Sequence, residues 1–207
     1  FAPLGHIVDG RWRSIVTDEL GAPLACLEED GAPVWRGALD VFGAHADRAA
    51  LELERRALKD PLMLQQPILP GILALLDDAR ALSFPIGLAS NSPHSWCDAH
   101  LTRLGLFDRF TFLACREDVP SPKPEPDLYN LVLNRFGLRG HEAIAFEDSR
   151  TGSLAATRAH VHTVACPGPS TVHHDFSHVD LRVASLADVT LGQLITRFGS
   201  SPERHFQ

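Results

Sequence analysis

From Pro70 onward, the hydrophobic positions alternate between helical spacing and short apolar runs. Apolar residues three or four positions apart predict amphipathic helices, whereas short continuous apolar runs predict buried strands. The predicted strands cover residues 84–89, 110–114, 143–146 and 161–165. The predicted helices cover residues 72–82, 94–104, 128–136 and 150–158. Strands that alternate with helices through short connections predict a parallel sheet with helices on its faces.

The first 66 residues follow other patterns. Residues 1–45 hold short apolar segments separated by turn signals such as Asp30-Gly31, and a dipeptide of this type between apolar runs indicates a hairpin because glycine accepts positive φ. Residues 46–66 are mostly strong helix formers, with Pro61 as a stop signal. We therefore expect a β-hairpin segment at 1–45, a helical cap-like segment at 46–66 and an α/β core at 67–207.

The composition of the chain argues against several classes of protein. Hydrophobic residues make up 44% of the chain and charged residues 22%, with a net charge of −7, as in ordinary soluble proteins. The negative charge argues against a nucleic-acid partner, since such proteins usually present a basic face. No apolar run is long enough to span a membrane. The four cysteines are widely spaced, without a Cys-x-x-Cys pair, which disfavours structural zinc and favours reduced thiols in a cytoplasmic protein.

Three polar clusters fall at or near the carboxyl ends of predicted strands, where ligands bind in parallel sheets. Ser90-Asn91-Ser92 follows an apolar run, and its hydroxyl and backbone N–H groups could bind a phosphoryl oxygen. Lys123 lies between prolines at a helix entrance. Glu147-Asp148 directly follows another apolar run, and adjacent carboxylates suit a hard cation such as Mg²⁺.

Each cluster also has a plainer interpretation when it is taken alone. Ser90 could cap a helix, and Lys123 could be a surface lysine. Glu147-Asp148 could cap the helix that follows it.

In combination, these motifs resemble the haloacid dehalogenase superfamily, in particular its phosphatase and phosphomutase-like branch with a helical cap. The resemblance runs from Pro67 to Asp188 and rests on Leu69-Pro70-Gly71, Leu88-Ala89-Ser90-Asn91-Ser92, Leu104-Gly105-Leu106-Phe107-Asp108, Lys123-Pro124-Glu125-Pro126-Asp127-Leu128-Tyr129, Phe146-Glu147-Asp148-Ser149 and Ala184-Ser185-Leu186-Ala187-Asp188. It implies a Rossmannoid three-layer fold with a parallel sheet, and residues 46–60 then look like a remnant of the cap.

The resemblance also implies a function, a Mg²⁺-dependent phosphatase that acts on a small phosphorylated metabolite. In this interpretation Ser90 and Asn91 bind the phosphoryl group, and Lys123 neutralises its charge during catalysis. Asp148, with Glu147 beside it, holds Mg²⁺.

The nucleophile of the resembled family is not in its usual form. That family places two aspartates in an Asp-x-Asp-Gly-Thr pattern at the end of its first strand, and no Asp-x-Asp precedes Ser90. Asp18 could be the nucleophile, with Leu20 in place of the acid, or Asp9 could be the second aspartate, with Ile7 at the nucleophile position. A further alternative places the nucleophile in a stretch that precedes Phe1.

A second resemblance competes for the same residues. Residues 16–43 are similar to the terminal core of an RHS (YD-repeat) protein, in which Asp18 would be a turn residue. The alternative function is then a catalytically inactive fusion that serves as a binding or structural module. In either case the central strand of the sheet must come from Leu4–Val8, Ser14–Thr17, a preceding stretch or a second chain, because unpaired buried backbone groups are costly.

Overall fold

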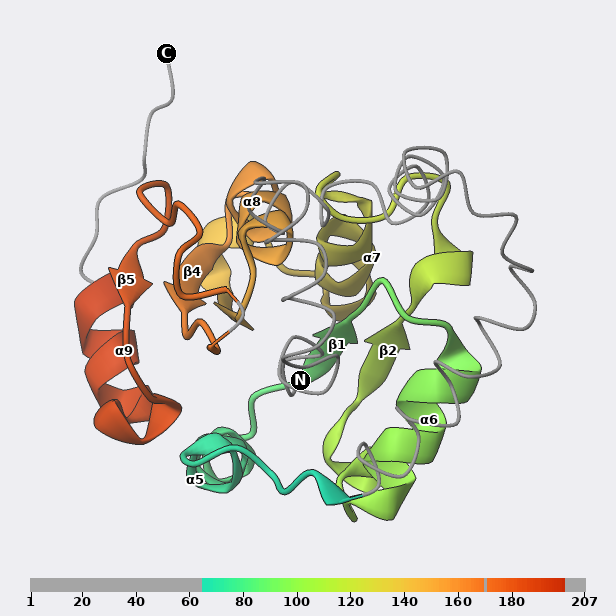
Figure 1. The fold of residues 1–207 in the computed structure, drawn as a ribbon, viewed down its shortest axis with the longest axis horizontal. Coiled ribbons are helices and arrows are strands. Elements are labelled where there is room, and N and C mark those ends of the chain that lie inside the picture. The colour runs from blue at the N-terminus through green and yellow to red at the C-terminus, as the bar shows by residue number, and fades with distance from the viewer. Residues whose placement is uncertain (1–64, 170, 200–207) are drawn as a thin grey trace, which may run out of the picture. The chain divides into compact units, whose positions relative to one another are not determined.

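The computed structural model describes residues 65–169 and 171–199 of the chain, and helices alternate there with short strands (Figure 1). The strands are β1 (Gly87–Ala89), β2 (Phe112–Ala114), β3 (Ile144–Glu147), β4 (His162–Ala165) and β5 (Leu181–Arg182). The α-helices are α5 (Ile72–Ala81), α6 (His94–Arg103), α7 (Asp127–Phe136), α8 (Arg150–Arg158) and α9 (Leu191–Gly199). Short 3-10 helices are η2 (Phe107–Arg109), η3 (Arg116–Asp118), η4 (Gly140–Glu142) and η5 (Leu186–Asp188). The predicted α/β class is confirmed.

The chain forms two compact units, and the core unit comprises Pro67–Pro167 and Asp175–Gln207. The other unit comprises Phe1–Gln66 and Gly168–His174, and in its described part the His174 N–H donates to the Thr171 carbonyl at 2.9 Å. The predicted hairpin and cap-like segments fall, apart from residues 65–66, outside the described residues. The three-part division therefore stays a prediction.

All strand pairs in the described core are parallel. β1 pairs with β2, ending with Ala89 opposite Ala114, and β3 pairs with β4, ending with Glu147 opposite Ala165. β5 continues the second set in the order β3-β4-β5. Parallel pairing brings the carboxyl ends of neighbouring strands to one edge of each sheet. The segments predicted to supply a central strand, Leu4–Val8 and Ser14–Thr17, lie outside the described residues.

Helices cover both faces of the set formed by β3 and β4. Ala145 packs in a cluster with Ala156 of α8 on one face. On the other face, Ile144 and Val164 pack with Leu194 of α9, so that β4 lies between α8 and α9 (Figure 1). Successive side chains of a strand point to opposite faces, and the alternation of Ile144 and Ala145 between the two clusters follows from this geometry.

Part of the core differs from the pattern predicted along the sequence. β1 and β2 are shorter than predicted, since β1 begins at Gly87 and β2 at Phe112. β5 and α9 were not predicted at all. α9 packs on β4, a strand distant in sequence. The spacing of its apolar residues buries Leu194 and Phe198 there.

The packing of α9 gives a first testable prediction. Leu194 is 1% exposed and contacts the buried Val164 cluster, so Leu194→Ala should lower the free energy of unfolding by about 2–5 kcal/mol. Denaturant titration of the variant measures this change. Thr196→Ala on the exposed side of the same helix is the control and should change stability by no more than about 0.5 kcal/mol. Equal effects of the two substitutions would contradict the assigned packing of α9.

Candidate functional site

The polar clusters predicted from the sequence come together where strands end. Ser90 directly follows β1, and Glu147 is the last residue of β3. Lys123, on the loop before α7, forms an ion pair with Glu147. The two side chains are only 10% and 8% exposed, so this ion pair is largely removed from water. This ion pair joins the second and third predicted clusters by a direct contact.

Ser90 is held at the end of β1 by its own backbone and side chain. Its N–H donates to the Ala114 carbonyl at 2.9 Å, and its Oγ accepts a hydrogen bond from the Ser92 N–H at 3.1 Å. The residue is 7% exposed. Ser90 thus continues the β1–β2 ladder and belongs to a turn, and the plainer interpretation of Ser90 as a helix cap is wrong because Pro93 occupies the cap position of α6.

Asn91 connects the end of β1 to the Lys123 loop. Its side-chain Nδ2 donates to the Lys123 carbonyl at 3.0 Å, and its Oδ1 accepts from the Lys123 N–H at 2.9 Å. Both polar ends of the amide are therefore used to hold the backbone of Lys123. The predicted substrate-binding role of Asn91 stays a prediction, and the contact observed is with the loop that carries Lys123.

The same loop is anchored on its other side by α8. The Arg158 guanidinium donates to the Pro124 carbonyl and pairs with the Glu125 carboxylate, each at 2.9 Å. Three successive residues of the loop, Lys123, Pro124 and Glu125, are therefore tied to other elements. A lysine on a loop fixed in this way loses little backbone freedom when its ammonium binds a partner.

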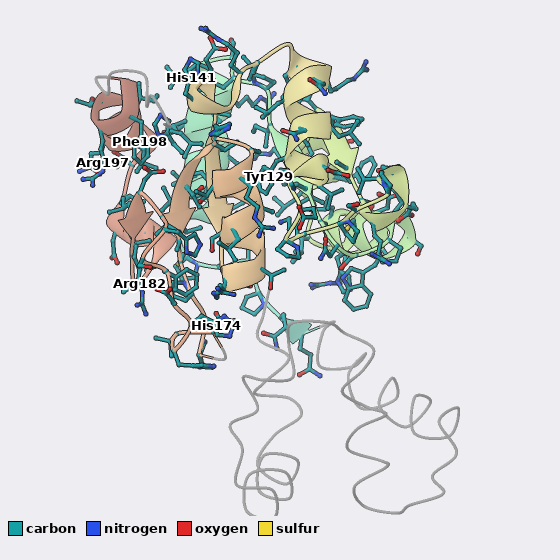
Figure 2. All side chains as sticks on the ribbon, turned by 90° about the horizontal axis from the view of Figure 1, so that it is seen from above. Tyr129, His141, His174, Arg182, Arg197 and Phe198 are labelled. Atoms are coloured by element: carbon teal, nitrogen blue, oxygen red, sulfur yellow. The ribbon has the colours of Figure 1, made fainter. Side chains whose placement is uncertain are left out.

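Tyr129 is a member of the site that reasoning from the sequence missed. It lies in the first turn of α7, between α7 and α8 (Figure 2), and its hydroxyl donates to Glu147 Oε1, the oxygen that also pairs with Lys123. The Lys123 ammonium lies 5.0 Å from the centre of the Tyr129 ring. Burial and the charge of Glu147 raise the pKa of Tyr129 well above its ordinary value, which keeps the hydroxyl protonated. Tyr129 is the last residue of the motif that runs from Lys123 to Tyr129, and this position was the signal in the sequence that could have identified it.

The other oxygen of Glu147 faces the first turns of α8. A Cβ on Gly152 would overlap Glu147 Oε2, so only glycine lets the helix approach the carboxylate this closely. Ser149 caps the helix, since its Oγ accepts from the Gly152 N–H at 3.1 Å. The plainer interpretation of Glu147-Asp148 as the cap of this helix is therefore wrong.

Asp148 is the residue whose chemistry fits a cation. Burial, followed by the neighbouring Glu147 charge, raises the pKa of Asp148, and Lys123 offsets part of this effect. A partly buried carboxylate with a raised pKa gains stability from a nearby cation. Mg²⁺ typically binds one or two carboxylates and keeps several waters, and Asp148 with Glu147 supplies such donors. In residues 65–169 and 171–199, no group of three or more His, Cys, Asp or Glu side chains gathers as a metal site.

The comparisons with known proteins give the family. The model of the haloacid dehalogenase-like hydrolases matches residues 14–160. The chain belongs to this family. Asp18 lies within the matched residues and outside the described ones. The resemblance of residues 16–43 to an RHS protein gains no support from the comparisons, and these residues also lie outside the described part of the chain.

Curated relatives match much of the chain. "Putative phosphatase YhcW" of Bacillus subtilis is 37% identical over 156 residues, which cover 75% of this chain and 70% of the relative. Hexitol phosphatase B of Escherichia coli is 30% identical over 131 residues, which cover 63% of this chain. The matched residues span 59% of the length of hexitol phosphatase B and 56% of the CbbY protein of Rhodobacter capsulatus.

Solved structures share the fold. CbbY from Rhodobacter sphaeroides, in complex with phosphate, has a TM-score of 0.63 and 26% identity, and the match covers 73% of this chain and 70% of that one. A β-phosphoglucomutase from Clostridium difficile has a TM-score of 0.63 at 21% identity over 78% of this chain and 73% of its own. In the part of the chain that the structure describes, no helix is long and apolar enough to cross a membrane.

The raised pKa of Asp148 gives a testable prediction on the metal-free protein. Because the folded pKa lies above the unfolded value of 3.8, ionisation of Asp148 costs stability, and this cost grows as pH rises through the folded pKa. Asp148→Asn should therefore raise the melting temperature at neutral pH without Mg²⁺ and leave it unchanged well below pH 3.8. Thermal melts of both proteins across pH, with a chelator, measure the difference. A variant that is less stable than the wild type at neutral pH would contradict this account of Asp148.

Proposed function

We propose that this chain is a Mg²⁺-dependent phosphatase that acts on a small phosphorylated metabolite. The observation that carries the proposal is the buried Lys123–Glu147 pair, which stands beside Asp148 where β3 ends. The proposal is supported by family membership and by relatives whose names describe phosphatases, with YhcW and hexitol phosphatase B among them. A CbbY structure with 26% identity contains phosphate.

The proposed roles follow from charge and position. The Lys123 ammonium would neutralise the phosphoryl oxygens, and its fixed loop would keep it in place without reorganisation at the moment of reaction. The Ser90 hydroxyl, oriented by the hydrogen bond it accepts from the Ser92 N–H, would donate a hydrogen bond to a phosphoryl oxygen. Mg²⁺ held by Asp148, with Glu147 beside it, would supply further positive charge to the phosphoryl group.

Asp18 is the proposed nucleophile. Its carboxylate would attack phosphorus and form a covalent intermediate that water then releases, which divides one difficult displacement into two easier ones. Asp18 lies within the residues that match the family model, whereas Asp9 precedes them. Leu20 stands where the family's second aspartate is expected, so water would have to take over the proton transfer to the leaving group.

A second candidate is a phosphate-binding module without turnover, in which residues 16–43 serve as an RHS-type structural segment. The observation that favours it is the absence of any Asp-x-Asp before Ser90. The two candidates differ in catalysis and share the binding of Mg²⁺ and phosphate.

Hydrolysis of a generic phosphate ester distinguishes these candidates. We expect the purified chain to release phosphate from p-nitrophenyl phosphate with Mg²⁺, and to lose this activity with a chelator and in Asp18→Asn. Calorimetry with Mg²⁺ and inorganic phosphate is the parallel measurement. Binding without hydrolysis would favour the binding module, and a folded protein that neither binds nor hydrolyses would overturn both candidates.

Lys123 should contribute strongly to the rate. Lys123→Met removes the charge and keeps most of the length of the side chain, so kcat should fall about 10²–10³-fold, as when one preorganised stabilising group is lost. Arg139→Ala is the matched control, because Arg139 is an exposed cation before the start of β3. Circular dichroism checks that both variants fold. Equal kcat values for Lys123→Met and the wild type would argue against the role of Lys123.

A further inference from the structure

The Glu147 carboxylate is held from three elements at once. Its Oε1 accepts from both the Lys123 ammonium and the Tyr129 hydroxyl. Its Oε2 lies against Gly152 in α8. Lys123 lies on the loop before α7 and Glu147 ends β3, and α7 contacts this pair through Tyr129.

We infer that Tyr129 is a positioning residue of the phosphate site, which acts through Glu147. Its hydroxyl shares Glu147 Oε1 with Lys123, and this sharing sets both the place of the ammonium and the part of its charge that remains for a phosphoryl group. The inference rests on the proposed function, because it assumes that Lys123 binds phosphate.

Glu147 Oε1 shares its electron density between two donors, the Lys123 ammonium and the Tyr129 hydroxyl. Hydrogen bonds to an ionised carboxylate are strong and short, so a second donor on Oε1 weakens the hold of that oxygen on Lys123. The ion pair is largely buried, where solvent screens charges only slightly. Without the Tyr129 hydroxyl, Glu147 would neutralise Lys123 more completely, and the ammonium would attract a phosphoryl dianion less.

The ring of Tyr129 contributes separately from its hydroxyl. The Lys123 ammonium lies 5.0 Å from the ring centre, a distance at which a cation is attracted to the aromatic face. Tyr129→Phe keeps the ring and this contact and removes only the hydrogen bond to Glu147. The substitution therefore isolates the proposed function of the hydroxyl.

The first experiment measures the binding of inorganic phosphate by calorimetry in the full chain with Mg²⁺. Tyr129→Phe should weaken the affinity about tenfold, as expected for one hydrogen bond to a charged group. Thr163→Val is the matched control, because the Thr163 hydroxyl is fully buried and donates to the Val161 carbonyl at 3.0 Å, away from the strand end that carries the site. It should leave the phosphate affinity unchanged.

A double-mutant cycle tests whether Tyr129 acts through Glu147. In a Glu147→Gln background, Tyr129→Phe should change the phosphate affinity less than about threefold, since a neutral amide forms a weaker hydrogen bond than a carboxylate. A full tenfold loss in that background would show that Tyr129 acts independently of Glu147, and would overturn the inference.

Phosphate binding by the wild-type protein separates the inference from the function on which it rests. A wild-type protein without phosphate binding would overturn the proposed function together with the inference, whereas wild-type binding that Tyr129→Phe leaves unchanged would overturn the inference alone.

Discussion

The ion pair between Lys123 and Glu147 is the interaction on which the site depends. Removing two charges from water is costly, and a buried pair is maintained only with good geometry and further hydrogen bonds. The core supplies both. Tyr129 adds a donor to the carboxylate, and Asn91 holds the backbone of Lys123 through two hydrogen bonds. Much of the surrounding structure can be understood as the support that this pair requires.

The parallel strands explain why this support is available. Ser90 directly follows β1 and Glu147 is the last residue of β3, and helices α6 and α8 begin a few residues after them. α8 starts with a Ser149 cap and approaches Glu147 through Gly152, which has no Cβ. α7 brings Tyr129 from its first turn. The packing of helices on the strands therefore also determines where the polar groups meet.

Family membership and the site bear on different properties of the protein. Membership of the haloacid dehalogenase-like hydrolases rests on residues 14–160, and it gives the fold and the general class of chemistry. The Lys123–Glu147 pair and the neighbouring Asp148 support the proposed ligands, a phosphoryl group and Mg²⁺. The departure from Asp-x-Asp concerns a separate requirement, the nucleophile, so phosphate binding and phosphate hydrolysis are properties that this chain could possess independently.

The sequence alone determined the α/β class, the approximate elements of the core and the polar clusters at strand ends, because hydrophobic spacing and turn residues are local signals. Only the tertiary structure decided which partners those polar groups have. The contacts of Glu147 with Lys123 and Tyr129 join residues 24 and 18 positions apart, and Asn91 and Lys123 are 32 apart. Such separations carry no periodic pattern, and the pairing depends on how helices and strands pack in three dimensions. β5 has only two residues and is placed by its pairing with β4, whereas α9 carries a local signal, the helical spacing of Leu191, Leu194 and Phe198, from which it could have been predicted.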